Sequence, residues 1–574
     1  MTSDVASTKG PKDRTVIGIS FGNSNSSIAY TTSEGKVEVI ANEDGDRQIP
    51  SILSYVDGEE YYGQQAKQQL IRNSNNTVAY FRDFLGLDCK SIDSTHCQAS
   101  AHPQEHESVT AFKIRDKEND EESIVSISEI ITRQISRLVK SAADYIGKPV
   151  DAAVITIPID FSNQQRECLM ESAKNGGIEV LQLIHEPIAA LLAYDSQPEA
   201  KLIDKNVVVA DFGGTRSDIS VIASRCGIYT ILATVNDKKF AGANLDQALI
   251  KHFANEFVKQ NGKDFAPLDN PRSKAKLKLE SEATKKALSI GTNASFSVES
   301  LISGVDFSTT INRYRYETIA RQVFEGFNHL IVSAIEKSNL DILEIDEVIL
   351  SGGTSHTPRI ALNLQKIFTS PKTRILAPST FATAINPSEL QVRGAAIQAN
   401  LIHKFDQESI KLYTNPLLTT STYLSKAIGV LSISDDSSKG VFIPIIKDKT
   451  SVPARRSIQI ATPREGGDVL IKIVEANSHI KVLKPEPKTK SDDKGKNNDE
   501  SGFDSDSEQD EEAEIREKIW QVGNTLAEAA LRGIKKGSKI EITATVASDL
   551  TLSIVCREEE TGISVQGEIH HKSS

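Results

Sequence analysis

Two glycine turns in this chain could bind phosphate groups. Each turn lies between two strand-like runs, in VIGISFGNSNSSIAY around Gly22 and in VVVADFGGTRSDISVI around Gly213. Glycine lets the main chain approach a phosphate closely, and successive backbone N–H groups form an anion-binding nest. The two copies lie 191 residues apart, about the length of one lobe, so a pair of facing phosphate hairpins is favoured over two ordinary tight turns.

A third glycine turn strengthens the phosphate interpretation. The apolar run Val348–Leu350 is followed by Gly352 and Gly353, and Pro358 then opens a predicted helix. A strand-to-helix junction of this kind suits nucleotide contact, because the N-terminal amides of a helix attract phosphate. The three turns together predict a nucleotide site built from segments that are far apart in the sequence.

Hydrophobic patterning divides the chain into two parts that must position these turns. From Thr15 to about Lys404, short β-branched runs alternate with longer amphipathic runs, which predicts an α/β fold. From about Leu417 onward, strand-like runs separated by turn residues predict a β-sandwich. These runs are Ala427–Ile433, Val441–Ile446, Ser457–Ala461, Val469–Val474, Ile540–Val546 and Leu550–Val555.

Two polar segments are predicted to be disordered. Residues 484–514 interrupt the sandwich with a Lys-rich and then Asp/Glu/Ser-rich stretch, in which Phe503 is the only large apolar residue. Such a stretch cannot bury enough apolar surface to offset its loss of conformational entropy. Residues 1–14 are polar as well and have no apolar core of a signal peptide, so we expect a disordered N-terminus rather than a secretion signal.

Composition excludes several classes of protein. The 574 residues carry a net charge of −12, of which seven negative charges lie between Asp504 and Glu514, so the remainder is nearly balanced at −5. Without a broad basic surface, we expect no direct nucleic-acid binding. The absence of a run of about 18 apolar residues argues against a membrane span, and the five cysteines without a CxxC pair indicate reduced packing thiols. We therefore expect a cytoplasmic protein.

The motifs carry a resemblance to a known family. Residues 15 to about 402 resemble the nucleotide-binding domain of the heat shock protein 70 (Hsp70) family, the DnaK-like members of the actin-fold ATPases. Further matching segments are NEDGDRQIP at Asn42–Pro50, YIGKPV at Tyr145–Val150, ITIPIDFSNQQR at Ile155–Arg166, LIHEPIAALLAY at Leu183–Tyr194 and INPSELQVRGAAIQ at Ile385–Gln398. The resemblance implies an α/β domain of two actin-like (ribonuclease H-like) lobes around ATP and magnesium, followed by a linker and a peptide-binding β-sandwich.

The resemblance also implies domain boundaries. The ATP-binding domain would span 15–405, with lobe I at about 15–203 plus 385–405 and lobe II at about 204–384. A linker at 406–416 and a β-sandwich at 417–574 would follow. In the family a helical lid comes next, whereas the strand signals here continue almost to Ser574, so we expect a lidless sandwich. The family linker is Leu-rich and docks on the ATP domain; here only Ile410 and Leu412 are available for that role.

Departures from the family pattern concentrate at the phosphate end of the site. Ser20 stands where the family has an aspartate that helps to hold hydrated magnesium, and Asn23 stands where it has a threonine. Arg82, in AYFRDFLG, aligns with the catalytic lysine. Magnesium prefers carboxylate and water oxygens, and a rigid guanidinium replaces a lysine poorly where the lysine positions the attacking water. Ser20 and Arg82 are therefore degenerate catalytic positions, and we expect little or no ATP hydrolysis.

The second hairpin combines preserved and altered residues. Thr215 replaces a family glycine and narrows the approach to a phosphate, while Arg216 could clamp the γ-phosphate or point to solvent. The resemblance assigns Asp211 and Glu186 to magnesium, both through water, and Glu186 reads equally well as a carboxylate stabilised by a helix N-terminus. We expect ATP binding with weakened magnesium.

The adenosine side resembles the family more closely. Glu282, Lys285 and Ser289 fall on one face of a predicted helix, although such a face is more often simply solvated. His356 and Ser388 replace a base-stacking arginine and an aspartate of the family. The resemblance assigns nucleotide contacts to Gly22, Asn23, Ser24, Gly213, Gly214, Thr215, Arg216, Glu282, Lys285, Lys286, Ser289, Gly352, Gly353 and His356.

The edited catalytic positions and the missing lid resemble the atypical family members of fungal ribosome-associated complexes. That resemblance implies a stable heterodimer with a zuotin-like J-domain protein, indirect association with the ribosome, and assistance to a separate ribosome-bound Hsp70 chaperone. The alternative is an active lidless chaperone ATPase that binds client peptides itself. A nucleotide-exchange factor is disfavoured, because those relatives carry extended helical C-terminal regions.

A sandwich without a helical cover should leave a sheet edge open to an added strand of the partner. The alternative is that Gly562–Ile569 folds back and closes the edge itself.

Overall fold

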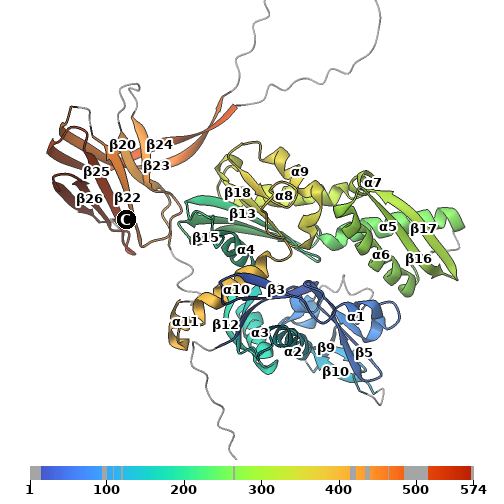
Figure 1. Ribbon diagram of the computed structural model, residues 1–574. Helices are drawn as coiled ribbons and strands as arrows, with labels where there is room; N and C mark the ends of the chain where they lie inside the picture. The colour runs from blue at the N-terminus through green and yellow to red at the C-terminus, as the bar shows by residue number, and fades with distance from the viewer. Residues whose placement is uncertain are drawn as a thin grey trace, which may run out of the picture. The chain divides into compact units, whose positions relative to one another are not determined.

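The computed structural model describes residues 14–92, 100–107, 109–117, 121–262, 266–413, 422–432, 440–462, 465–483 and 515–570. The chain divides into two compact units, Met1–Thr420 and Ser421–Ser574 (Figure 1), which are treated separately below. The residues 1–13, the acidic insertion 484–514 and Cys97 lie outside the described residues, so the predictions of disorder stay predictions.

Unit 1 contains two sheets with the same strand order. The first runs β12 (Glu179–His185), β11 (Ala152–Ile157), β1 (Val16–Phe21), β2 (Asn25–Thr31) and β3 (Val37–Ile40), with β4 (Ile49–Pro50) paired to β2. The second runs, in the corresponding order, β19 (Arg374–Leu376), β18 (Glu347–Ser351), β13 (Lys205–Phe212), β14 (Ser217–Arg225) and β15 (Ile228–Asp237). In each sheet an antiparallel hairpin is joined to a strand parallel to its first strand. The repeat of glycine hairpins is thus a repeat of whole lobes.

The helices follow the same repeat. Helices α2 (Ile127–Ile146) and α8 (Arg321–Lys337) precede β11 and β18, and α3 (Asn163–Asn175) and α9 (Pro358–Ile367) follow these strands. Helices α4 (Glu186–Asp195) and α10 (Leu390–Ile402) then follow the last strand of each sheet. Because the helices cover the sheets, β11 is buried along its whole length and reads as a continuous apolar run, AAVITI.

The remaining elements of unit 1 extend the two lobes. They are β5 (Ile52–Val56), β6 (Glu59–Tyr62), α1 (Gly63–Gln69), β7 (Thr77–Ala79), β8 (Gln104–His106), β9 (Val109–Ile114) and β10 (Ser123–Ser126) in lobe I, and α5 (Gly242–Asn261), α6 (Pro271–Ile290), β16 (Asn293–Ile302), β17 (Val305–Asn312) and α7 (Arg313–Ile319) in lobe II. Each lobe has its own apolar core, the first including Phe21, Phe112 and Ile135, the second Phe212 and Phe253. The predicted two-lobed α/β fold is confirmed.

Helices α4 and α10 cross at very close range. A Cβ atom at Gly394 of α10 would lie 1.8 Å from the carbonyl oxygen of Ala189 of α4. A Cβ atom at Gly18 of β1 would lie 2.2 Å from the backbone nitrogen of Ala396. Because no side chain fits at either glycine, α10 rests directly on α4 and on β1, and these contacts fix the residues at the ends of both helices.

The segment predicted as a linker includes a short helix, α11 (Gln407–Tyr413), that belongs to unit 1. Ile410 is 5% exposed and packs in the cluster with Ala152, Leu181 and Ile402. Leu412 is 59% exposed. Of the two residues proposed to dock on the ATP domain, only Ile410 is buried there.

Unit 2 is a β-sandwich. One sheet runs β21 (Val441–Ile446), β20 (Ala427–Ser432), β23 (Gly467–Leu483) and β24 (Ile515–Ile534), and the other runs β22 (Ala454–Ala461), β25 (Lys539–Val546), β26 (Leu552–Glu558) and β27 (Ser564–Ile569). Their facing sides share a core that includes Val430, Ile473, Ile542 and Ile554. The predicted sandwich is confirmed, although the sequence pattern missed β24 and ended β23 at Val474.

The C-terminal segment lies beside β26 and covers it, while the binding of a partner strand to the sandwich stays a prediction. Residues Ser564–Ile569 form β27 and pair with β26 from Leu552↔Ile569 to Arg557↔Ser564. The alternative, in which Gly562–Ile569 folds back on the sheet, is the one observed. The edge moves outward by one strand, and β27 now carries it in the described part of this sheet.

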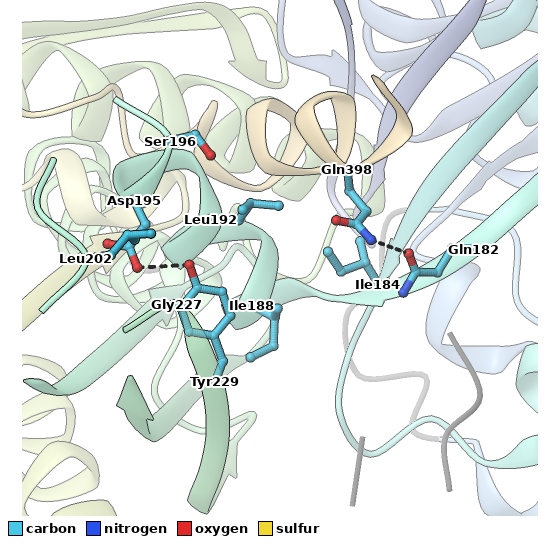
Figure 2. Close-up of a pocket in the computed structure, with 10 residues that line it drawn as sticks. All are labelled: Gln182, Ile184, Ile188, Leu192, Asp195, Ser196, Leu202, Gly227, Tyr229 and Gln398. Carbon is cyan, nitrogen blue, oxygen red and sulfur yellow. Dashed lines mark hydrogen bonds between the residues drawn. The ribbon is translucent and has the colours of Figure 1, made fainter. Parts of the chain in front are cut away.

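A buried ionic cluster joins α4 to the second sheet of unit 1. The Nζ atom of Lys205 lies 2.7 Å from Oδ1 of Asp195 and 2.8 Å from Oε2 of Glu347. The Tyr229 hydroxyl donates a hydrogen bond of 2.9 Å to the other oxygen of Asp195, beside a small cavity that Ile188 and Leu192 also line (Figure 2). Arg374 approaches Glu347 from the surface.

Replacing Lys205 by methionine tests this cluster. The substitution leaves Asp195 and Glu347 buried with only the half-exposed Arg374 as a cation, so we expect unfolding to become easier by ~3–5 kcal/mol. Urea unfolding of the full chain measures the change. Lys36→Met, at an exposed position, is the matched control and should change stability by less than about 0.5 kcal/mol. Equal effects of both substitutions would contradict the prediction.

Candidate nucleotide-binding site

The residues assigned to the nucleotide line one cavity of about 1000 Å³ in unit 1. Both sheets contribute their hairpins to its wall, and α6 and the turn after β18 are among the other segments that line it. The lining includes Ser20, Gly22, Asn23, Ser24, Arg82, Glu186, Asp211, Gly213, Gly214, Thr215, Arg216, Glu282, Lys285, Lys286, Ser289, Gly352, Gly353, His356 and Ser388. The structure therefore brings every predicted site residue together.

The carbonyl groups of the first hairpin turn are bound to the protein body. The Gly22 carbonyl accepts a 2.8 Å bond from the Ser51 hydroxyl, and the Ser24 carbonyl accepts a 3.0 Å bond from the Ser51 amide. A peptide unit carries its N–H on the side opposite to its carbonyl. The amides of Asn23 and Asn25 are therefore turned toward the cavity, as a phosphate site requires.

The second hairpin turn is held in the same way. The Gly213 carbonyl accepts bonds of 3.0 Å from the Thr354 hydroxyl and from the Gly242 amide, and the Gly214 carbonyl accepts a 2.8 Å bond from Ala243. Thr354 belongs to the third glycine turn, so that turn supports the second hairpin directly. This arrangement presents the amides of Gly214 and Thr215 to the cavity.

Gly352 occupies a conformation and a space that other residues cannot. Its φ of +83° lies in the left-handed region, and a Cβ atom there would be 2.4 Å from Oδ1 of Asp211. Glycine at this position lets the Asp211 carboxyl group lie against the main chain of the third turn.

Arg82 is buried, and its guanidinium group is bound by neighbouring groups of the protein. Its Nη1 atom lies 2.9 Å from Oε1 of Glu186 and 3.2 Å from the Phe21 carbonyl oxygen, and its Nε atom donates to Asp83 at 2.8 Å. The guanidinium is permanently charged and rigid. Arg82 therefore pairs with Glu186, the first residue of α4, and its donors are taken up by Glu186, Asp83 and the Phe21 carbonyl.

Arg216 does not point to solvent, and it lines the cavity with its charge paired to carboxylates. Its Nη2 atom donates to both carboxylate oxygens of Asp160 at 3.1 Å, and its Nε atom donates to Asp218 at 2.7 Å. Its side chain is 12% exposed. Arg216 thus links the second hairpin to the loop after β11 instead of pointing to solvent.

Ser20 and Asp211 are connected through Gln391 at the start of α10. The Ser20 hydroxyl donates to Oε1 of Gln391 at 3.1 Å, and Nε2 of Gln391 donates to Oδ2 of Asp211 at 2.8 Å. Burial and the neighbouring Asp218 raise the pKa of Asp211 to about 6. Burial together with Asp211 and Asp218 also raises the pKa of Glu186, against the opposing effect of Arg82.

The carboxylates at this end do not fit a magnesium ion held by the protein. Glu186 is paired with Arg82, Asp218 with Arg216, and Asp211 accepts from Gln391, while Ser20 supplies no charge. Among the described residues, no group of three His, Cys, Asp or Glu side chains is placed to hold a metal ion. The donor set differs from the hard, unpaired oxygen ligands that magnesium prefers.

At the other mouth of the cavity, Glu282 of α6 joins the two lobes. Lys67 of α1 reaches its two oxygens at 2.7 and 2.8 Å, and Lys286, one helical turn on, lies at 2.8 Å. Burial alone would raise the pKa of Glu282, but Lys67, Lys286 and Lys285 lower it. Glu282 is therefore ionised and fixed in place beside the predicted adenosine position.

Two further residues of the adenosine side are held by neighbours. Lys285 pairs with Asp246 at 2.8 Å. Nε2 of His356 lies 3.0 Å from Asn386 and 3.1 Å from Ser388, so two substituted positions contact each other. Burial lowers the pKa of His356, which leaves the imidazole neutral at pH 7. A base stacked on it would meet a neutral ring rather than the cation of an arginine.

Several residues of the site were not predicted from the sequence. They are Lys67, Asp160, Asp246, Asn386 and Gln391, which act through contacts with predicted residues. Asn386 and Gln391 lie in the INPSELQVRGAAIQ segment, and Asp160 lies in ITIPIDFSNQQR, so the resemblance was the one available signal for these three. Lys67 and Asp246 are single polar residues on α1 and α5 with no distinguishing spacing.

Comparison with known proteins decides the family. The model of the Hsp70 protein family matches residues 16–490. The chain belongs to the Hsp70 family. It is 42% identical to the ribosome-associated complex subunit SSZ1 of Saccharomyces cerevisiae over 558 residues, covering 96% of this chain and 99% of that protein.

Two other relatives show how the similarity decreases. A heat shock protein 70 homolog of Schizosaccharomyces pombe is 40% identical over 561 residues, covering 96% of this chain and 95% of that protein. Heat shock 70 kDa protein 14 of Danio rerio is 31% identical over 469 residues, covering 81% of this chain and 89% of that protein. Family membership implies nucleotide binding, which agrees with the cavity described above.

Two other sequence predictions concern membrane-spanning helices and the state of the cysteines. No helix in the described part of the chain combines the length and apolarity needed to cross a membrane. Among the described residues, Cys89, Cys168, Cys226 and Cys556 form no disulfide, and of these Cys556 is buried.

Substitution of Asp211 by asparagine tests the electrostatics of the site. The pKa of Asp211 rises from 3.8 to about 6, so folding favours its protonated form. Its contribution to stability is complete below about pH 4 and is lost as the pH rises through 6. Asp211→Asn should therefore stabilise the nucleotide-free chain by ~1–3 kcal/mol at pH 7 and flatten the pH dependence between about 4 and 6.

Denaturant unfolding across that pH range measures both effects. Asp144→Asn, an exposed position on α2, is the matched control and should leave the curve unchanged. A destabilised Asp211→Asn chain at pH 7 would show that the ionised carboxylate is needed for the fold.

Proposed function

We propose that this chain is an atypical Hsp70 co-chaperone subunit that binds ATP with little or no hydrolysis. It forms a stable heterodimer with a zuotin-like J-domain protein, associates with cytoplasmic ribosomes through that complex, and assists a ribosome-bound Hsp70 chaperone in the folding of nascent chains. Magnesium supports the nucleotide only weakly.

The ion pair of Arg82 with Glu186 is the main support for the proposed loss of hydrolysis. Hydrolysis of a phosphoanhydride depends almost entirely on positioning and on electrostatic stabilisation. Here the cation at the catalytic position is bound to a carboxylate and to the Phe21 carbonyl, and Ser20 supplies no charge for a metal. The two groups that would position the water and the ion are thus occupied or neutral.

The observation that supports a complex is the similarity over nearly the whole of SSZ1, whose name describes a subunit of a ribosome-associated complex. This similarity includes both the nucleotide-binding unit and the sandwich. The co-chaperone role follows from the family, and the J-domain partner is the finer part of the proposal.

The sandwich offers a specific place for an added strand. Pairing of β20 with β23 ends at Ala427↔Ala476, whereas β23 and β24 stay paired as far as Leu483↔Ile515. From Asn477 onward, β23 and β24 are therefore paired with each other and no longer with β20 in the described strand pairings. A two-stranded ribbon is marginally stable alone and gains from a third strand, such as an extended segment of the partner.

The first test of this function is single-turnover ATP hydrolysis by the purified full chain. We expect calorimetry to show ATP binding, while no product forms on the timescale at which Hsp70 ATPases complete a turnover. Ser20→Asp with Arg82→Lys need not restore hydrolysis, because Asn23 and Thr215 also differ from the family.

A matched control separates the charge of Arg82 from its shape. Arg82→Lys alone keeps the charge and should stay inactive, because Ser20 is unchanged. Turnover by the wild-type chain at ordinary family rates would instead favour the active lidless chaperone.

The second test is hydrogen exchange of the full chain with and without the J-domain partner. We expect amides of residues 477–483 and 515–522 to exchange about tenfold or more slowly in the complex, because an added strand protects edge amides. Strands β25 and β26, inside the other sheet, serve as the internal control. A stable complex without new protection in unit 2 would place the interface on unit 1.

A further inference from the structure

The two phosphate hairpins of unit 1 are bonded to each other through their side chains. Nδ2 of Asn23, in the first turn, donates to Oγ1 of Thr215, in the second turn, at 3.0 Å. Asn23 is 7% exposed and Thr215 is 4% exposed. Both residues differ from those of the family at these positions. This side-chain bond needs both substitutions.

The orientation of the Asn23 side chain is fixed at its other end. Its Oδ1 atom accepts a bond of 3.4 Å from the Asp83 amide, beside Arg82. The amide group therefore bridges a neighbouring backbone segment of lobe I and the turn of lobe II. A buried bond with both ends supported is costly to break, because each partner would be left unsatisfied.

A second connection runs from β1 to β13 through α10. The Ser20 hydroxyl donates to Gln391, and Gln391 donates to Asp211, at 3.1 and 2.8 Å. The family aspartate at position 20, once ionised, could only accept hydrogen bonds. Its negative charge would also repel the negative charge of Asp211. The hydroxyl of Ser20 instead continues a chain of donors and acceptors across the base of the cavity.

A third connection follows Thr215 directly. Arg216 donates to both oxygens of Asp160, in the loop after β11, and so joins lobe II to lobe I by a forked ion pair. The Asp160 side chain is 47% exposed, so this pair alone contributes modestly to closure. Its effect adds to the buried bond of the neighbouring Thr215.

We propose that these three connections hold the lobes of unit 1 closed without nucleotide, so that ATP does not switch the unit between open and closed states. A ligand shifts a conformational equilibrium only by the difference of its affinities for the two states. Bonds that already favour the closed state leave little population for ATP to move. The substituted side chains supply the attraction between lobes that a nucleotide would otherwise supply.

This inference goes beyond the proposed loss of hydrolysis and predicts an additional property. A site can bind ATP without hydrolysing it and still open and close as the nucleotide leaves and returns. Here the surface of unit 1 that a partner meets is constant, whether or not the cavity is filled.

Hydrogen exchange of the nucleotide-free full chain tests the proposal. In the wild-type chain, peptides covering residues 81–85 and 159–162, which include the lobe contacts Asp83 and Asp160 but no amide assigned to phosphate, should exchange slowly, and saturating ATP should change their rates by less than about twofold. Calorimetry on the same sample establishes that ATP is bound, so a failure of nucleotide binding is distinguished from a failure of closure.

The decisive variant is Thr215→Gly with Asp160→Asn, which removes two connections and restores the family glycine. Both segments should then exchange about tenfold faster without nucleotide, the change expected from losing a buried hydrogen bond, and ATP should reverse the change. Asp160→Asn alone should give a smaller change, and it alters no residue that lines the cavity. Asp144→Asn on α2 is the matched control and should give none.

Two results would overturn the proposal. One is a wild-type chain in which residues 81–85 and 159–162 exchange about tenfold more slowly once ATP is added, because its lobes would then open without nucleotide. The other is a double variant that exchanges like the wild type. If strand β11 also exchanges faster in the double variant, the variant is unfolding, and the wild-type comparison decides the question by itself.

Discussion

The close crossing of α4 and α10 is the contact on which the nucleotide site depends. Gly394 leaves no room between α10 and the backbone of α4, and Gly18 leaves none between α10 and β1. The first residue of α4 is Glu186, and Gln391 lies in the first turn of α10. A shift of either helix would move both the partner of Arg82 and the residue that connects Ser20 to Asp211. The packing of two glycines thus determines the electrostatics of a site formed by charged residues.

The duplicated lobes explain why the substitutions contact one another. Equivalent hairpins of the two sheets face a single cavity, so Asn23 of one and Thr215 of the other meet across it. Taken alone, each substitution suggests a damaged site. Ser20 lacks the carboxylate of the family, Arg82 replaces a lysine, and Thr215 has a side chain where the family has glycine. In the structure, Ser20 connects through Gln391 to Asp211 and Thr215 bonds to Asn23, so these substitutions add contacts between the lobes. Arg82 instead pairs with Glu186 and Asp83 inside lobe I.

Sequence reasoning identified the parts of the fold that local pattern controls. The glycine hairpins, the apolar strands and the adenosine helix were predicted because each has a short repeat of residue types. Strand β24 was missed because its LAEAALRG segment contains good helix formers, and only pairing along β23 makes it extended. Asp160 and Gln391 were missed for a related reason. Their roles come from partners more than 50 residues away, which no local spacing encodes.

Arg82 shows how a buried charge becomes part of the structure around the nucleotide cavity. A charge taken out of water is tolerated only when a partner compensates it, and here Glu186 and Asp83 provide that compensation. Once the pair is formed, removing either member leaves an uncompensated charge in the protein interior. Arg82 is therefore hard to replace, because its contacts hold the start of α4 against the first hairpin of lobe I. The stability of lobe I depends on this contact whether or not any nucleotide is hydrolysed.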